Sequence, residues 1–200
     1  AYGEVGWLKG LLTVGSKEQP MELKNQELSS GSQTLGINAR PVPAVRLSLP
    51  DYWVIPGTKG WLSLKGHISY GMPTDDGWQR DFTHKQSKHT EHTLLHTKAG
   101  YVKIGPDRMP VSLELGMEMA CQFGGSSYTY TGEKIESTGG LKGMLRAFIP
   151  GGNDVTDEGY DNANGNHLGS IVGRLNFDYP AWGLSAYTSR SEERVSRNAE

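Results

Sequence analysis

Glu114 and Glu118 are the first residues whose type and spacing could support catalysis. They lie in VSLELGMEMACQF, residues 111–123, where apolar residues alternate with small or polar ones. This alternation predicts a β-strand, and four residues at ~3.4 Å each would place the two carboxylates roughly 14 Å apart on one side of it. Paired glycosidase carboxylates need about 5 to 9.5 Å. The two glutamates are therefore not predicted to act as an acid and base pair.

Metal ligands are the next possibility. HKQSKHTEHTLLH, residues 84–96, contains four histidines: His84, His89, His92 and His96. His92 and His96 would share a strand face, but no HExxH order or cysteine partner accompanies them, so a polar loop is the simpler interpretation. Residues 153–166, NDVTDEGYDNANGN, are rich in oxygen ligands, yet turn chemistry explains them equally well. We predict no metal site and no cofactor, with calcium at residues 153–166 as the open alternative.

Other chemistries lack a motif. Cys121 is the single cysteine and falls on the apolar side of its strand, which predicts a packed thiol rather than a nucleophile. The sequence contains no G-x-S-x-G, P-loop or C-x-x-C pattern for hydrolase, nucleotide or thiol chemistry. A net charge of −2 offers no basic face for nucleic acid. We predict a protein that is not an enzyme and does not bind nucleic acid.

The elements that would position these residues are mostly strands. Alternation returns in residues 60–71 and 166–179, and 27 glycines with 10 prolines suit a chain of many turns. A weaker alternation of apolar and polar residues is present in residues 5–14, 42–49, 93–105 and 183–189. The sequence thus predicts an all-β protein of about seven strands. Several reach the roughly 9 to 11 residues that a tilted strand needs to cross a bilayer.

Short and long connections alternate along the chain. PDRMP and PAWG are tight, whereas three connections are long and polar: residues 15–40, 72–92 and 124–165. This alternation is typical of outer-membrane barrels, which have short periplasmic turns and long outer loops. In the third long connection, residues 140–149 carry apolar residues at helical spacing, which predicts a short amphipathic helix.

A bilayer would explain the alternation. A sheet that faces lipid must pair all its backbone groups, so only a closed antiparallel transmembrane β-barrel spans the membrane, with apolar residues outward. Tyr70 at the loop end of its strand, and Phe177, Tyr179 and Trp182 at the turn end of theirs, would form the aromatic girdles. A soluble β-sandwich with one solvated face alternates in the same way. No membrane-spanning helix or signal peptide is predicted.

Longer segments carry more specific information. Four segments matter here. Residues 28–82 contain NARP and DDGWQRD, and residues 113–125 read LELGMEMACQFGG. Residues 145–159 contain GGNDVTDEG, and residues 165–187 begin with GNHLGSIVGRLNFDYPAWG. Their order and spacing strongly resemble the capsule assembly Wzi family in its Bacteroides-type branch. The resemblance implies a large outer-membrane barrel that holds capsular polysaccharide at the cell surface, lectin-like and without catalysis. Family members are more than twice this length, and the tail SRSEERVSRNAE departs from the family pattern.

The domain organisation follows. Residues 1–190 are predicted to be part of a single β-barrel domain, and residues 191–200 a polar tail. The side chains expected to face the lumen are Lys65, His67, Lys98, Glu114, Glu118, Arg174 and Asp178. They would form either an ion-pair lattice that blocks the barrel or the wall of a watery channel.

Sugars are bound by aromatic faces and hydrogen-bonding groups, with arginine or lysine for polymers that carry carboxylates. The candidate polysaccharide-binding residues are Arg40, Trp78, Arg80, Lys142 and Arg146. A packed loop tryptophan and a solvated helix face are the alternative interpretations.

Three functions are compatible with the sequence. The first is a lectin-like protein of the bacterial outer membrane, whose partners are surface polysaccharide and outer-membrane lipid. The second is a general porin, which a steady conductance in planar bilayers would distinguish from a silent lectin. The third is a soluble β-sandwich that binds or cleaves glycans, which would stay in the aqueous phase without detergent.

Overall fold

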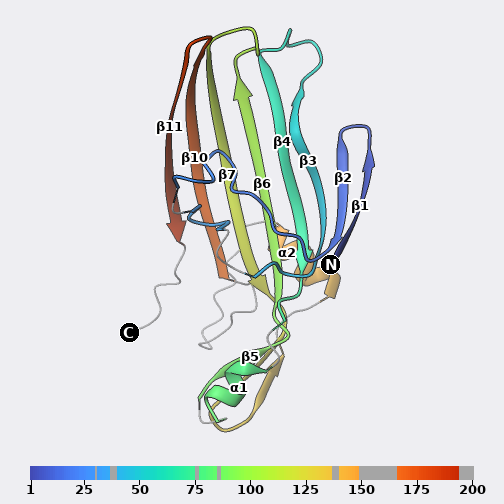
Figure 1. Ribbon diagram of the computed structural model, residues 1–200. Coiled ribbons are helices and arrows are strands. Elements are labelled where there is room, and N and C mark those ends of the chain that lie inside the picture. The colour runs from blue at the N-terminus through green and yellow to red at the C-terminus, as the bar shows by residue number, and fades with distance from the viewer. Residues whose placement is uncertain are drawn as a thin grey trace.

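The computed structural model describes residues 1–29, 31–36, 40–74, 77–84, 87–136, 140–148 and 166–193. Most of these residues form one antiparallel sheet of eight strands, ordered β1-β2-β3-β4-β6-β7-β10-β11 (Figure 1). Its strands are β1 Tyr2–Trp7, β2 Gly10–Gly15, β3 Ala44–Val54, β4 Leu62–Gly71, β6 Leu94–Ile104, β7 Val111–Phe123, β10 Asn166–Tyr179 and β11 Trp182–Glu193. The prediction of an all-β protein is confirmed. The sheet is not closed into a barrel, because β1 and β11 each pair on one side only among the described strands.

The pairing register assigns each residue to one of two faces. Tyr101 pairs with Lys65 and Gly116, and Gly116 with Val172, whereas the next row along joins Leu64, Val102 and Leu115. Because directly paired residues share a face, these rows alternate between the two sides. We call the side with Lys65, His67 and Glu118 the polar face, and the side with Ile68, Met117 and Ile171 the apolar face. The alternation predicted for β4, β7 and β10 is confirmed.

One predicted strand was wrong. Residues 5–14 do not form a single strand; β1 and β2 form a hairpin that turns at Leu8 and Lys9. Leu8 adopts φ 51° at this turn and is fully exposed. The sequence contains the signal for the break, because the apolar positions shift from odd-numbered residues, Val5 and Trp7, to even-numbered ones, Leu12 and Val14. The turn of two residues places Val5 opposite Leu12, so the apolar residues of both strands lie on one face.

The long connections emerge at one end of the sheet and the short turns at the other, as predicted (Figure 1). The first long connection is not simply an external loop. Its residues 16–29 and 31–36, here called the strap, run across the sheet in blue in Figure 1 and contact the polar face.

The second and third long connections contain one helix that the sequence predicted and a small folded unit that it did not. Helix α1, Trp78–Phe82, lies against a three-stranded sheet of β5 His89–Glu91, β8 Ser126–Tyr128 and β9 Lys134–Glu136. We call this unit the loop head; it projects beyond the large sheet in Figure 1. Helix α2, Gly140–Phe148, confirms the predicted amphipathic helix. The suggested calcium segment, apart from Asn166, and most of the polar tail lie outside the described residues.

Candidate functional site

The two faces of the large sheet have inverted exposure. On the apolar face, Met117 is 54% exposed and Ile171 52% exposed, whereas on the polar face Glu118 is 0% and His67 6% exposed. A sheet in water normally buries its apolar side and solvates its polar side. A continuous exposed apolar surface of this kind marks a site of contact with another apolar surface.

The strap is what buries the polar face. Glu22 of the strap forms an ion pair with Lys65 at 2.6 Å, and Ser32 donates a hydrogen bond to Glu118. Thr34 donates a hydrogen bond to Ser170 at 2.8 Å. The strap is therefore tied to strands β4, β7 and β10 at separate points.

Apolar contacts accompany these polar ones. Leu23 of the strap is buried with Tyr101 and Val172, and Leu35 and Tyr52 pack against the same cluster. This cluster is one of two small apolar cores formed by buried described residues. The strap thus fills the centre of the polar face.

Glu118 and Glu114 are held by separate hydrogen-bond networks. The Tyr101 hydroxyl donates to Glu118 at 2.9 Å, and Ser170 donates to the same carboxylate at 3.4 Å. Glu114 accepts from the Tyr52 hydroxyl at 2.6 Å and from the Asn176 amide at 2.7 Å. Because neighbouring side chains already bond both carboxylates, each glutamate links parts of the sheet together rather than facing an open site.

The structure places most of the predicted lumen set on one face. The register puts five of them in the middle of the polar face: Lys65, His67, Glu114, Glu118 and Arg174. Asp178 shares this face but is exposed at its turn end. Lys98 was assigned wrongly, because it pairs with Ile68 and Met119 and therefore lies on the apolar face.

Aromatic residues mark the turn end of the sheet. Tyr179 and Trp182 stack with ring centroids 4.8 Å apart, and both are exposed, whereas Tyr70, predicted for the girdle at the loop end, packs against α2. Three further exposed tryptophans lie at this end: Trp7, Trp53 and Trp61. Four of the five tryptophans in the sequence are therefore gathered at the turn end.

Among the predicted sugar-binding residues, Trp78 and Arg80 come together on α1 in the loop head. Trp78 and Phe82 are both largely exposed, with ring centroids 6.3 Å apart. Helix α1 is fixed to β5 because the Thr90 backbone N–H donates to the Gln79 side chain at 3.1 Å. The two rings thus form an exposed aromatic surface on an anchored support.

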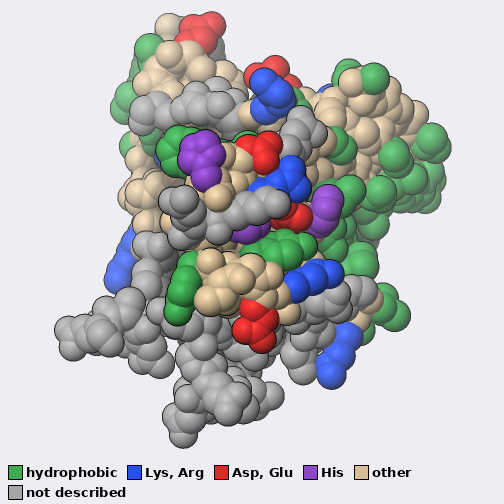
Figure 2. All heavy atoms as spheres, turned by 90° about the horizontal axis from the view of Figure 1, so that it is seen from below, with side chains coloured by type: hydrophobic (Ala, Val, Ile, Leu, Met, Phe, Trp, Pro, Cys, Tyr) green, Lys and Arg blue, Asp and Glu red, His purple; other side chains and the backbone are tan. Residues whose placement is uncertain are grey.

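A cavity of about 310 Å³ lies beside α1, lined by Met72, Pro73, Thr74, Gly77, Arg80, Glu91 and His92. Arg80 bonds Asp81 at 3.0 Å and Glu91 at 3.3 Å. The hydrogen bond to Asp81 raises the pKa of the Arg80 guanidinium above its ordinary value. The lining of the cavity therefore carries charges of both signs rather than cations alone. Seen from the loop end, charged and histidine side chains gather in the middle of the molecule (Figure 2).

The other predicted sugar-binding residues do not join this group. Arg40 is exposed at the end of the segment that follows the strap. Lys142 is exposed on α2, which packs against the large sheet rather than the loop head. Arg146 lies on the same helix, and its side chain is outside the described part of the chain.

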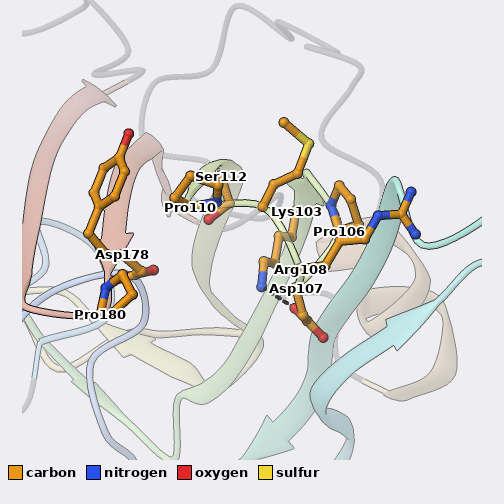
Figure 3. A pocket seen from close by; sticks show the side chains of 10 residues that line it. Lys103, Pro106, Asp107, Arg108, Pro110, Ser112, Asp178 and Pro180 are labelled. Carbon is orange, nitrogen blue, oxygen red and sulfur yellow. Dashed lines mark hydrogen bonds and ion pairs between the residues drawn. The ribbon is translucent and has the colours of Figure 1, made fainter.

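A second cavity, of about 490 Å³, lies at the turn end (Figure 3). Its walls come from the β6–β7 and β10–β11 turns, with Lys103, Asp107, Arg108 and Asp178 as the charged members. Lys103 forms an ion pair with Asp107 at 2.8 Å, which is the dashed line in Figure 3. Sequence reasoning did not identify this cavity, because two turns far apart in the chain form it.

The histidines of residues 84–96 do not come together to form a metal site. His92 adopts φ 56° just before β6, so it does not share a strand face with the buried His96. In the part of the chain that the structure describes, no three His, Cys, Asp or Glu residues are arranged to hold a metal ion. Cys121 is buried, and its Sγ lies 3.6 Å from Nε2 of His167. The prediction that Cys121 is packed is confirmed.

Neither helix of the described chain is long and apolar enough to cross a membrane. Comparisons with known proteins do not assign the chain to a family. No family model, curated protein or solved structure matches the sequence or the fold.

Proposed function

We propose that this sheet is part of the wall of an outer-membrane β-barrel that holds polysaccharide at the bacterial cell surface. The observation that carries the membrane part of the proposal is the inverted exposure of the two faces. Hydrocarbon in contact with Met117, Ile171 and their neighbours would remove apolar area from water, at roughly 25 cal/mol per Å². The buried polar face would then be the lumen side.

Among the described strands, β1 and β11 each pair on one side only, which is consistent with a sheet that continues. In lipid, the unpaired backbone groups of an edge strand cost several kcal/mol each by order of magnitude. The proposal therefore requires further strands beside β1 and β11. Strand lengths of 10 to 14 residues from β4 to β11 in the large sheet also suit a tilted crossing of the bilayer.

The strap favours a holding role over a diffusion channel. It occupies the centre of the polar face with Leu23 and is tied there by the Glu22–Lys65 ion pair. A porin lumen needs that space for water and solutes. A lectin-like protein needs only its outer loops, which is the role implied by the resemblance to capsule assembly proteins.

The loop head is the surface best suited to sugar. Trp78 and Phe82 offer exposed aromatic faces, and sugar rings stack on such faces. Arg80, Asp81 and Glu91 beside them offer charged hydrogen-bonding groups to hydroxyls. Lys142 and Arg146 lie elsewhere on α2, so the proposal rests on Trp78 and Arg80 rather than on all five predicted residues.

Fractionation of the native cells tests the membrane assignment. We expect the full-length protein in the outer membrane, and we expect its mobility on a gel to change when the sample is boiled, because closed barrels resist detergent until heated. Recovery in a soluble fraction without a mobility change would overturn the proposal and favour the β-sandwich. Deletion of the gene should release capsule from the cells, and a normally retained capsule would contradict the polysaccharide role.

Trp78→Ala should weaken binding of the cell's own surface polysaccharide by about tenfold, because one stacked ring contributes roughly 1 to 1.5 kcal/mol. The measurement is calorimetric titration of the detergent-solubilised protein with polysaccharide fragments. Trp182→Ala is the matched control, since Trp182 is also exposed but lies at the turn end. Equal losses in both variants, or none in either, would remove the loop head from the proposal.

A further inference from the structure

Helix α2 packs on the apolar face of the sheet, not over the polar face. The pairing register places Tyr70, His96, Cys121 and Phe123 on the apolar face, at its loop end. Cys121 and Phe123 form a buried cluster with Ala147 of α2.

Polar contacts fix the same arrangement. The Tyr70 hydroxyl donates to the Met144 carbonyl at 3.0 Å. The Lys98 ammonium donates to the Phe148 carbonyl and lies 4.5 Å from the centre of the Phe148 ring. A cation at a helix C-terminus is favourable, because the last carbonyls carry partial negative charge. The residue assigned wrongly to the lumen therefore holds the end of α2 on the outside of the wall.

The side of α2 that faces away from the sheet is also apolar. Leu141 is 73% exposed and Leu145 58% exposed, one helical turn apart. Lys142 is exposed beside them, and the helix sequence GLKGMLRAF contains two cations and no acidic residue. A short helix with exposed leucines and only positive charge has the composition of helices that lie in the headgroup region of a bilayer.

The height of α2 on the wall fits this location. Val111 and Phe177 pair near the turn end, and Cys121 and His167 pair ten residues further along the same two strands. Ten residues span roughly 33 Å along a strand, or roughly 25 Å along the membrane normal at a tilt of ~40°. An apolar band of ~25 Å is what outer-membrane barrels present between their two interfaces. The exposed aromatic residues and α2 would lie at opposite edges of that band.

We propose that α2 is an interfacial helix that seats the outer rim of the wall in the lipid of the outer leaflet. Leu141 and Leu145 enter the boundary of the acyl chains, while Lys142 and Lys98 lie level with the anionic headgroups. Helix α2 lies on the same side of the sheet as the exposed apolar residues, so the same lipid would cover both. This inference rests on the proposed membrane location, and it assigns Lys142 to lipid rather than to polysaccharide.

Depth-dependent fluorescence quenching tests it. Single cysteines are introduced in the full-length protein as Leu145→Cys, Met117→Cys and Ser87→Cys, labelled with a polarity-sensitive dye, and refolded into phosphatidylcholine and phosphatidylglycerol vesicles with brominated acyl chains. The parent protein is the blank, because the buried Cys121 should take no label. A mobility shift on boiling checks that each variant has folded.

We expect loss of most of the fluorescence at positions 145 and 117, and little loss at position 87 in the loop head. Quenching at 117 without quenching at 145 would overturn the interfacial helix and leave the membrane wall standing. Absence of quenching at both would overturn the membrane location, and the inference with it. Shielding of position 145 that depends on protein concentration rather than on bromine would show that a second copy covers α2, which also overturns the inference.

Discussion

Met117→Arg should destabilise the protein by roughly 2–4 kcal/mol in a bilayer, because Met117 lies near the middle of the apolar face and a cation there would face hydrocarbon. The measurement is urea unfolding of the full-length protein in lipid vesicles, followed by tryptophan fluorescence. In water the same change at a half-exposed site would cost little, so the size of the effect reports what the apolar face contacts.

Ile104→Arg is the matched control, because Ile104 lies on the same face at its turn end. Near the interface an arginine costs only about 0–1 kcal/mol, since its head reaches the headgroups. A graded effect, large at Met117 and small at Ile104, supports a bilayer across the sheet. Two equally small effects would mean that water solvates the apolar face, and that the wall proposal is wrong.

Gly116→Ala should be the most damaging small substitution on the polar face. A Cβ at Gly116 would lie 2.2 Å from Cδ1 of Tyr101 and 3.1 Å from Cγ2 of Val172. Tyr101 is almost fully buried and is held by its hydrogen bond to Glu118, so its ring has no room to withdraw. Overpacking of this kind costs about 1–3 kcal/mol, measured by the same urea unfolding.

Gly100→Ala separates overpacking from the general effect of alanine in a strand. Gly100 is on the opposite face, and a Cβ there would meet nothing within 4 Å. We expect no loss, or a gain of about 0.4–1 kcal/mol from the reduced freedom of the unfolded chain. Tyr101→Ala and Gly116→Ala combined should cost less than the sum of the two single losses, because the clash is absent once the ring is removed. Equal effects of the two glycine substitutions would contradict the packing of Tyr101 on Gly116.

Period-two patterning was enough to predict the long strands and the face of most of their residues. It failed at Leu8 and Lys9, where the apolar positions shift from odd-numbered to even-numbered residues. A turn of two residues interrupts a weak alternation so briefly that the two strands resemble one. Patterning failed again at Lys98, which was predicted to face the lumen but which pairs with Ile68 and Met119 on the apolar face. The α2 helix was predictable because its apolar residues repeat at helical spacing.

The candidate site was less predictable than the strands. Trp78 and Arg80 were identified from residue type, yet the small sheet that supports them consists of strands of only three residues, too short for alternation to show. The strap was missed entirely. Its contacts join Ser32 to Glu118 and Thr34 to Ser170, pairs separated by 86 and 136 residues, and no local pattern encodes such distant partners.

Those separations also order the steps of folding. The strap follows the second strand of the sheet, but its anchors belong to β7 and β10, which are made much later in the chain. The contacts of Ser32 and Thr34 therefore cannot form until those strands are in place, whereas the Glu22–Lys65 ion pair needs only β4. We therefore expect the strap to be fully fixed on the polar face only after β7 and β10 have joined the sheet.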